Sequence, residues 1–520
     1  MREEFVIKMN GLRSMFRLWV ALCAVLAICG TSLSFAQQRI VVALASEPNS
    51  LDGHEVLVTP HLIILPHVYD KLVEYDQDMN IVPQLATSWS LSEDGRTWTF
   101  ELRRGHTFHD GTPVDAAAVK ASFERLLAQG FFRSWFSMVE SIDVVDSHTV
   151  AFTTSDLYLF LLQRMTFAGS GIVSPTAVAS MTQEEFGMRP VGSGPFVVAS
   201  WERGSRIVLE KNPSHWAASD SPIDVIEFRI IPDASARSVA LETGEVDYVQ
   251  LVPPLDAVRL AGDPDFQVYS VEQNRIEGLY MNVYRGPFTD IRVRHAVSYA
   301  IDRQAIVDAF GQGHAIVADS PLGREVWGYR GQEGFEYSPE RSRGLLAEAG
   351  YPNGFTATMW LTVGTGTDEY RKAQAIADML AAVGITLELE TLESGPYFDR
   401  LVKPPEESEL QVIFRSFATW TSEPDYGLNL LYHTSQHAPV GPNRNFYSNP
   451  EVDRLLELGP RTVDDAERRG IYERIQELIW DDQPWVYIMF PKTPAVGNRR
   501  LVGVHHLASS VTHFRYARVE

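Results

Sequence analysis

Cysteine is almost absent from this sequence. Its 520 residues include two cysteines, Cys23 and Cys29, and both lie in an apolar segment near the N-terminus. If that segment is removed, no thiol remains, which excludes disulfides and thiolate metal sites. Neither cysteine follows the small residue that a lipoprotein cleavage site needs, since Leu22 and Ile28 precede them. A lipid anchor is therefore not expected.

Positive charge is also scarce. The chain has 45 Lys and Arg against 67 Asp and Glu, for a formal charge of −22. An excess of negative charge disfavours nucleic acid and anionic membrane surfaces as partners. It is compatible with a cationic or zwitterionic ligand.

Enzyme and nucleotide motifs are missing as well. Gly192-Ser193-Gly194 has the wrong spacing for a G-x-S-x-G nucleophile turn. Gly364-Thr365-Gly366 lacks the third glycine and the later acidic residue of a dinucleotide fingerprint, and no Walker loop occurs. Carboxylates are abundant, so an exported hydrolase that works with acidic residues stays open as an alternative.

The N-terminus predicts export. Arg13 and Arg17 precede an uncharged run, 18–30, and the segment TSLSFA follows it with the small-residue pattern Ser34-Phe35-Ala36. This order is typical of a signal peptide cleaved after residue 36, and the run is too short for about 20 membrane-spanning residues. Residues 1–36 hold four Lys/Arg and two Asp/Glu, so the chain without them carries a formal charge of −24.

The remaining chain predicts an α/β or α+β protein with two or three domains. Its length exceeds one ordinary core, and strand and helix patterns mix throughout. A buried strand is expected at 39–45, a hairpin at 91–102, and a helix from 116 to about 128 with Asp115 as its cap. Further helices are expected at 337–350, 368–383 and 466–480, and strands at 385–392 and 484–491.

The stretch 417–432 (FATWTSEPDYGLNLLY) is the main candidate for a binding site. It follows an apolar run and brings together Trp420, Glu423, Asp425 and Tyr426. Because a proline and a glycine interrupt it, we expect a loop or turn rather than a helix. Two carboxylates between two large aromatic rings suit a cationic group lying against flat apolar surface. The alternative is a solvated acidic turn with a core tryptophan behind it.

Histidines offer weaker candidates for a metal site. His106 and His109 lie with Asp110 in the run HTFHD, which packs two imidazoles and a carboxylate into five residues. The run leads into a turn rather than lying on one helical face. His433 and His437 have the spacing of one helical face and follow the main candidate stretch.

Six phrases resemble a known family in their order along the chain. The sequence resembles the solute-binding proteins of bacterial peptide-type ABC transporters, extracellular solute-binding protein family 5, and within it the glutathione-binding subgroup. The phrases lie at 91–127 (with SEDGRTWTFELRRG), 190–216 (with VGSGPF), 241–247 (LETGEVD), 287–302 (PFTDIRVRHAVSYAID), 337–355 (YSPERSRGLLAEAGYPNGF) and 446–452 (FYSNPEV).

The resemblance implies a periplasmic binding protein fold of type II, cluster C. Two main lobes and an inserted smaller lobe would close on a ligand by hinge motion and present it to a membrane permease. The expected boundaries are a signal peptide (1–36), lobe I (37–77, 191–284 and 497–520), an inserted small lobe II (78–190) and lobe III (285–496). The expected location is the periplasm, and the expected state is a monomer without cofactor, enzyme activity or nucleic-acid partner.

The resemblance also implies site residues. Asp425 matches the acidic position that pairs with the ligand's α-amino group, and Glu423 is the alternative anchor. Trp420 and Tyr426 would wall the pocket, and Thr59, in the loop after the first strand, matches a threonine that faces the cleft. The implied ligand is a peptide or a glutathione-like amino compound. The alternatives within the family are a nickel-chelate or haem carrier, with His433 or His437 contributing, and an opine- or sugar-type carrier.

Overall fold

The structure is a computed structural model that describes residues 37–55, 59–362 and 367–520. The predicted signal peptide, residues 1–36, lies outside the described residues. Among the residues that are described, no helix is both long enough and apolar enough to cross a membrane.

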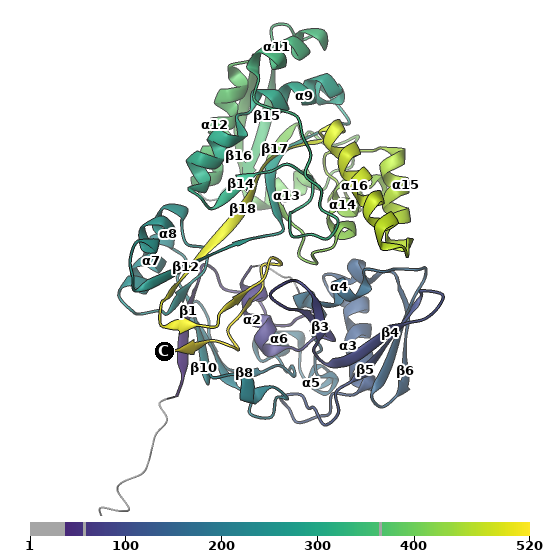
Figure 1. Ribbon diagram of the computed structural model, residues 1–520, viewed down its shortest axis with the longest axis vertical. Coiled ribbons are helices and arrows are strands. Elements are labelled where there is room, and N and C mark those ends of the chain that lie inside the picture. Colours follow the sequence, from purple (N-terminus) through teal and green to yellow (C-terminus); the bar gives the residue numbers. More distant parts are fainter. Residues whose placement is uncertain (1–36, 56–58, 363–366) are drawn as a thin grey trace, which may run out of the picture.

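One long mixed sheet runs through both main parts of the molecule (Figure 1). Strand β18 (Trp485–Asn498) is common to both parts because its first half pairs in the upper part and its second half in the lower part. Residues 485–490 of β18 are all buried, as expected for an apolar run in a central strand. Its antiparallel partners are β13 (Arg275–Met281), β14 (Ala315–Val317), β11 (Tyr248–Val249) and β12 (Phe266–Glu272).

The lower half of this sheet starts with the first strand of the described chain. Strand β1 (Arg39–Leu44) is parallel to its neighbours β10 and β11, so both connections between them are long crossovers. The sheet then continues through antiparallel pairs to its edge. These strands are β10 (Val225–Ile230), β9 (Arg206–Lys211) and β8 (Phe196–Glu202).

The upper half separates two layers of helices. Strand β17 (Val412–Ala418) shows this by alternation: Val412 and Phe414 belong to one core, and Ile413 on the opposite face belongs to the other. The outer layer contains α9 (Ile291–Ala300), α11 (Pro339–Glu348) and α12 (Thr367–Ala381). The inner layer contains α13 (Ser394–Leu401), α14 (Pro424–Tyr432), α15 (Pro450–Leu458) and α16 (Asp465–Asp482). Beyond β17 the sheet continues through β15 (Phe355–Thr362) to β16 (Ile385–Leu392).

A separate four-stranded sheet lies in the lower part, with the order β4-β5-β7-β6. Helix α3 (Ala116–Gln129) packs on it through Phe123, whose ring centroid is 4.9 Å from that of Phe152. Asp115 caps this helix by accepting a hydrogen bond from the Ala118 backbone N–H. The strands are β4 (Ala86–Leu91), β5 (Thr97–Leu102), β6 (Val139–Asp146) and β7 (Thr149–Thr154).

Shorter elements connect these layers. The helices are α2 (Thr59–Val68), α4 (Leu161–Met165), α5 (Pro175–Ser180), α6 (Gln183–Met188), α7 (Ala234–Glu242), α8 (Pro254–Ala261) and α10 (Arg303–Ile306). The short strands are β2 (Val73–Tyr75), β3 (Ile81–Pro83), β19 (Leu501–Val502), β20 (His505–His506), β21 (Thr512–His513) and β22 (Arg518–Val519).

The mixed α/β class is confirmed, and so are the individual helices and strands predicted from the sequence. Their ends agree to within a few residues, except that the strand predicted at 484–491 continues to Asn498. The lobe boundaries remain a proposal, and we keep their ranges as names. Strand β13 lies beside β17 in the sheet, which favours assigning residues 275–281 to lobe III rather than to lobe I.

Candidate functional site

The predicted loop at 417–432 is instead a turn followed by a helix. Ser422 takes the left-handed conformation (φ 54°), and α14 begins directly after Glu423. The expectation of a loop was wrong because Pro424 occupies the first helical turn, where its missing N–H costs nothing. Gly427 lies inside α14, and a Cβ there would come within 2.8 Å of the Thr419 hydroxyl oxygen. The glycine therefore lets the helix pack closely on the preceding turn.

Glu423 and Asp425 form a buried acid pair that meets an arginine of the small lobe. Arg164 Nη2 is 2.8 Å from Asp425 Oδ2, and Arg164 Nε is 3.4 Å from Glu423 Oε1. The Tyr158 hydroxyl donates to the same Asp425 oxygen at 3.0 Å. Glu423 is 0% and Asp425 4% exposed, so the contact is closed to solvent. Ion pairs between Arg164 and the two acids therefore connect the small lobe to lobe III.

One arginine between two buried carboxylates leaves the acid pair short of positive charge. Burial raises the pKa of Glu423 to about 7; Arg164 lowers it and the neighbouring Asp425 raises it. Burial also raises the pKa of Asp425, again against the effect of Arg164. Because both carboxyls are pushed toward their neutral forms, a second cation at this place would be bound favourably.

Glu423 and Asp425 differ in how many of their carboxylate oxygens already accept hydrogen bonds. Both oxygens of Glu423 accept from the Tyr426 backbone N–H, at 3.0 and 2.9 Å, so this side chain caps α14. Oδ1 of Asp425 is buried and has no hydrogen-bond partner among the described residues. The Asn429 side chain, one turn along, lies close enough to favour the ionised form of Asp425, but no hydrogen bond of normal geometry joins it to Oδ1. The geometry therefore leaves Asp425 as the carboxylate with a free acceptor.

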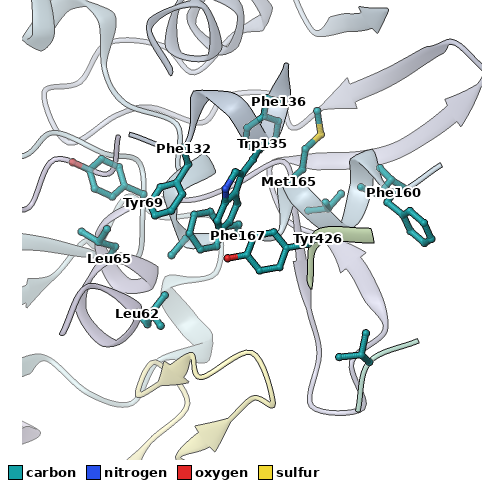
Figure 2. Packing of buried hydrophobic residues seen from close by; sticks show 14 of the residues in the cluster. Leu62, Leu65, Tyr69, Phe132, Trp135, Phe136, Phe160, Met165, Phe167 and Tyr426 are labelled. Atoms are coloured by element: carbon teal, nitrogen blue, oxygen red, sulfur yellow. The ribbon is translucent and has the colours of Figure 1, made fainter. Parts of the chain in front are cut away.

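Trp420 and Tyr426 lie in an aromatic cluster shared between the lobes. The Trp420 ring stacks on Phe167 of the small lobe, with centroids 6.0 Å apart and planes 14° apart. Tyr426 meets Trp135 edge-on at 4.3 Å, and Figure 2 shows it against Trp135 and Phe167. Trp420 is half-buried, and its indole N–H has no partner within the described part of the chain. Both rings therefore belong to the contact between lobes rather than to the core of lobe III alone.

A cavity of about 330 Å³ opens beside the acid pair. Ser422, the residue before Glu423, lines it, although neither acid does. Small-molecule pockets start at about this size. All three proposed lobes contribute to its wall, with Tyr75, Gln163, Trp327, Ser422 and Arg469 among the lining residues.

Thr59 lies apart from the acid pair, whereas His433, directly after α14, is close enough to favour the ionised form of Asp425. Thr59 is not in a loop but is the first residue of α2 and half-buried; among the described residues no hydrogen bond or ring contact joins it to the other four predicted residues. His433 and His437 do not share a helix, because α14 ends at Tyr432 and a separate 3-10 turn follows. His437 Nε2 meets the Tyr447 carbonyl at 2.9 Å.

The HTFHD run contributes one histidine to a buried cluster elsewhere. His106 and His215 direct Nε2 at opposite oxygens of Asp70, at 3.1 and 3.2 Å, and the three donor groups lie within 4.8 Å of one another. That spacing could suit a metal ion. However, the Ala217 backbone N–H donates to Nδ1 of His215, so the proton of a neutral His215 is on Nε2, where it donates to Asp70. His109 binds the Gly194 carbonyl instead.

Sequence reasoning missed Arg164 and Tyr158. Arg164 lies in the short helix α4, beside Gln163 and three apolar residues, and Tyr158 lies in the loop before it. The two residues are more than 250 positions from the acids they bind, so no local spacing connects them. A single arginine within a short, mostly apolar helix was the one signal available, because a buried charge needs a partner.

Comparisons with known proteins agree with this architecture. The family model of the bacterial extracellular solute-binding proteins, family 5 (middle), matches residues 80–439. The chain is 28% identical over 505 residues to the glutathione-binding protein GsiB of Pectobacterium atrosepticum, covering 96% of this chain and 98% of that protein. It is 29% identical over 476 residues to GsiB of Escherichia coli K12, covering 91% and 93%.

Solved structures of similar fold include binding proteins with different ligands. The periplasmic binding protein DppA of Helicobacter pylori, in complex with the peptide STSA, has a TM-score of 0.81 and 27% identity, with 94% of this chain and 100% of that chain covered. AgaA of A. tumefaciens R10, in complex with agropinic acid, has a TM-score of 0.78 and 27% identity, with coverage of 93% and 99%. The sequence resemblance and the fold class are confirmed: this chain belongs to the bacterial extracellular solute-binding proteins of family 5.

Proposed function

We propose that this protein is the periplasmic substrate-binding component of an ABC importer for a peptide or a glutathione-like amino compound. The ligand is captured between the lobes and passed unchanged to a membrane permease. The observation that carries the proposal is the buried acid pair of Glu423 and Asp425, which meets one arginine and keeps a free acceptor oxygen on Asp425.

The ammonium group of the ligand would complete this acid pair. A primary ammonium can donate to Oδ1 of Asp425, and charge-assisted bonds of this kind are short and strong. Trp420 and Tyr426 supply apolar ring surface beside the charge, and the cavity next to Ser422 provides space for the rest of the ligand. Relatives named for glutathione and a structural neighbour holding a peptide support an amino compound as ligand.

The arginine of the small lobe connects binding with closure. Arg164 reaches the acid pair only when lobes II and III are in contact, as they are in this structure. A ligand that brings its own cation to Asp425 adds to this contact across the cleft. Capture by lobe closure therefore needs no covalent step.

Mass spectrometry of the compound that co-purifies with the protein, followed by calorimetry, tests the proposal. Stripped protein is titrated with reduced glutathione and with a short peptide of free N-terminus. We expect stoichiometric binding of at least one of them and recovery of the ligand unchanged. Binding of neither, or recovery of a cleaved product, would refute the proposal, and the second outcome would favour the hydrolase.

A further inference from the structure

A groove of about 930 Å³ lies between strand β8 and the segment that carries helices α5 and α6. Residues 197–201 form one wall, and residues between Ser180 and Val191 form most of the other. We call it the β8 groove. None of the described residues that line it belongs to lobe III, and Figure 1 shows β8 and α5 at the lower end of the molecule, with α14 in the upper part. The β8 groove is therefore separate from the acid pair and from the cavity beside it.

Strand β8 is the open edge of the long sheet. Its strand neighbour is β9, and no described strand pairs with its other side. The Asn212 backbone N–H donates to the Pro195 carbonyl at 2.8 Å, which makes these two residues a hydrogen-bonded pair of the antiparallel ladder. Because such pairs alternate along the strand, Val198 turns its backbone N–H and C=O away from β9. The β8 groove is thus bordered by main-chain groups without a strand partner.

A bulge in β8 limits what can pair with this edge. Ala199 has no partner on β9, and the register shifts there between Val198 and Ser200. Bulges bend an edge strand and hinder long edge-to-edge pairing, such as pairing between two copies of one chain. A short extended segment avoids this obstacle, because it needs only a few residues of the edge. The edge therefore favours a short inserted segment over a second copy of this chain.

The walls of the β8 groove include partly exposed apolar side chains. Met181, Met188 and Val191 line its helical side, and all three are half-buried. On β8, the Trp201 indole N–H donates to Glu47 Oε1 at 2.7 Å, which fixes this ring in the wall. Methionine side chains are flexible and adapt to different partners. An extended segment that adds to an edge strand gains affinity from main-chain bonds and specificity from such side-chain contacts.

The charge along the β8 groove is negative. Its lining holds three carboxylates, Asp110, Glu184 and Glu185, against one arginine, Arg189. Burial lowers the pKa of His109, which also lines the groove, so this side chain is neutral. Three carboxylates against one arginine leave an excess of negative charge, and the whole chain adds to it with a formal charge of −22. A partner segment with positive charge is therefore complementary.

We propose that the β8 groove binds an extended segment of another protein, which adds to β8 as a short strand and carries alternating basic and apolar side chains. Its main chain bonds to the edge at Val198. Alternate side chains of a strand point to opposite sides, so one set meets the carboxylates and the other meets the apolar wall. This proposal does not depend on the proposed function, because the β8 groove shares no residue with the acid pair or its cavity.

Calorimetry with three matched peptides tests the proposal. The first peptide alternates lysine and valine over six residues and is blocked at both ends. The second has glutamate in place of lysine, and the third keeps lysine but has N-methylated valines, which cannot donate main-chain hydrogen bonds. The first peptide should bind at least tenfold more tightly than either of the others. No binding of the first peptide, or equal affinity for the N-methylated one, would overturn the proposal.

Two variants locate the binding. Proline is tolerated at an edge position whose N–H points away from the sheet, so Val198→Pro should keep its melting temperature and weaken binding of the lysine peptide at least tenfold. Glu184→Lys, on the exposed start of α6, should weaken it at least threefold. Glu407→Lys changes an exposed glutamate of lobe III and serves as the control, with no change expected. Unchanged binding in both β8-groove variants would overturn the proposal.

Sedimentation velocity tests for the other occupant, a second copy of this chain. We expect a monomer, both for the unaltered protein and for Val198→Pro. A dimer that Val198→Pro converts to a monomer would make the β8 groove a contact between copies and would overturn the proposal.

Discussion

Asp70 and Asp425 are both buried aspartates in contacts between segments far apart in the chain, yet their pKa values shift in opposite directions. Burial alone would raise the pKa of Asp70, but hydrogen bonds from His106 and His215 outweigh it and hold the pKa well below its usual value. The pKa of Asp425 is raised, because burial outweighs the effect of Arg164.

The difference lies in the number of donors. Asp70 receives hydrogen bonds from His106, His215, Ser193 and Gln84, which satisfy both oxygens. Oδ2 of Asp425 accepts hydrogen bonds from Tyr158 and Arg164, while Oδ1 has no hydrogen-bond partner among the described residues. A buried carboxylate with all its donors stabilises the fold. One that lacks a donor is suited to bind a cation from outside.

Removal of the Asp70 carboxylate should have the largest effect in this comparison. Asp70→Ala leaves a buried group of donors without their acceptor, and we expect a loss of about 3–5 kcal/mol in the free energy of unfolding. Urea unfolding followed by tryptophan fluorescence measures it, with the exposed Asp78→Ala as control. A loss below about 1 kcal/mol in the free energy of unfolding would show that the Asp70 carboxylate does not stabilise the fold.

Removal of the Asp425 charge should affect binding rather than stability. Asp425→Asn should weaken binding of a free-amine ligand by about 100-fold or more, because the remaining charge would be paired by Arg164 alone. Its free energy of unfolding should stay the same or increase. Glu423→Gln is the matched variant, and since Glu423 mainly caps α14, we expect about tenfold weaker binding with some loss of stability. The reverse order in calorimetry would make Glu423 the anchor.

Acid should favour the closed ligand-free form. In this closed structure burial raises the pKa of Glu423 to about 7, against 4.5 for an exposed glutamate, so the closed form binds more protons between these values than an open form in which Glu423 is exposed. The free energy that favours the closed over the open form is therefore largest at low pH. It declines as the pH rises to about 7, by up to about 1.4 kcal/mol per pH unit.

Small-angle scattering of stripped protein measures this dependence. The radius of gyration should be smaller at pH 5.5 than at pH 8, and Glu423→Gln should reduce the difference, because Asp425, whose pKa is also raised, remains. A larger radius at pH 5.5 would contradict the account of Glu423.

Local sequence signals predicted much of the fold. The Asp115 cap and the hairpin turn at 92–95 depend on neighbouring residues, and both were found in place. Helix α14 was missed because its cap is Glu423, an uncommon capping residue, and Pro424 was taken as a breaker rather than as a first-turn proline.

The site was predictable in part. Trp420, Glu423, Asp425 and Tyr426 lie in one short stretch, and the structure brings them together at one contact between lobes. Arg164 could not be predicted, because a pairing over such a distance depends on how two lobes meet rather than on any local pattern. The same holds for Asp70 with His215, which no motif connects.

Comparison of one peptide with its N-acetylated form tests whether Asp425 recognises the ligand's ammonium. If Asp425 binds the ligand's ammonium, calorimetry on the unaltered protein should show at least 100-fold weaker binding after acetylation, and Asp425→Asn should remove most of that difference. Equal affinities of the free and acetylated peptides would contradict the account, because the acid pair would then have no part in recognition.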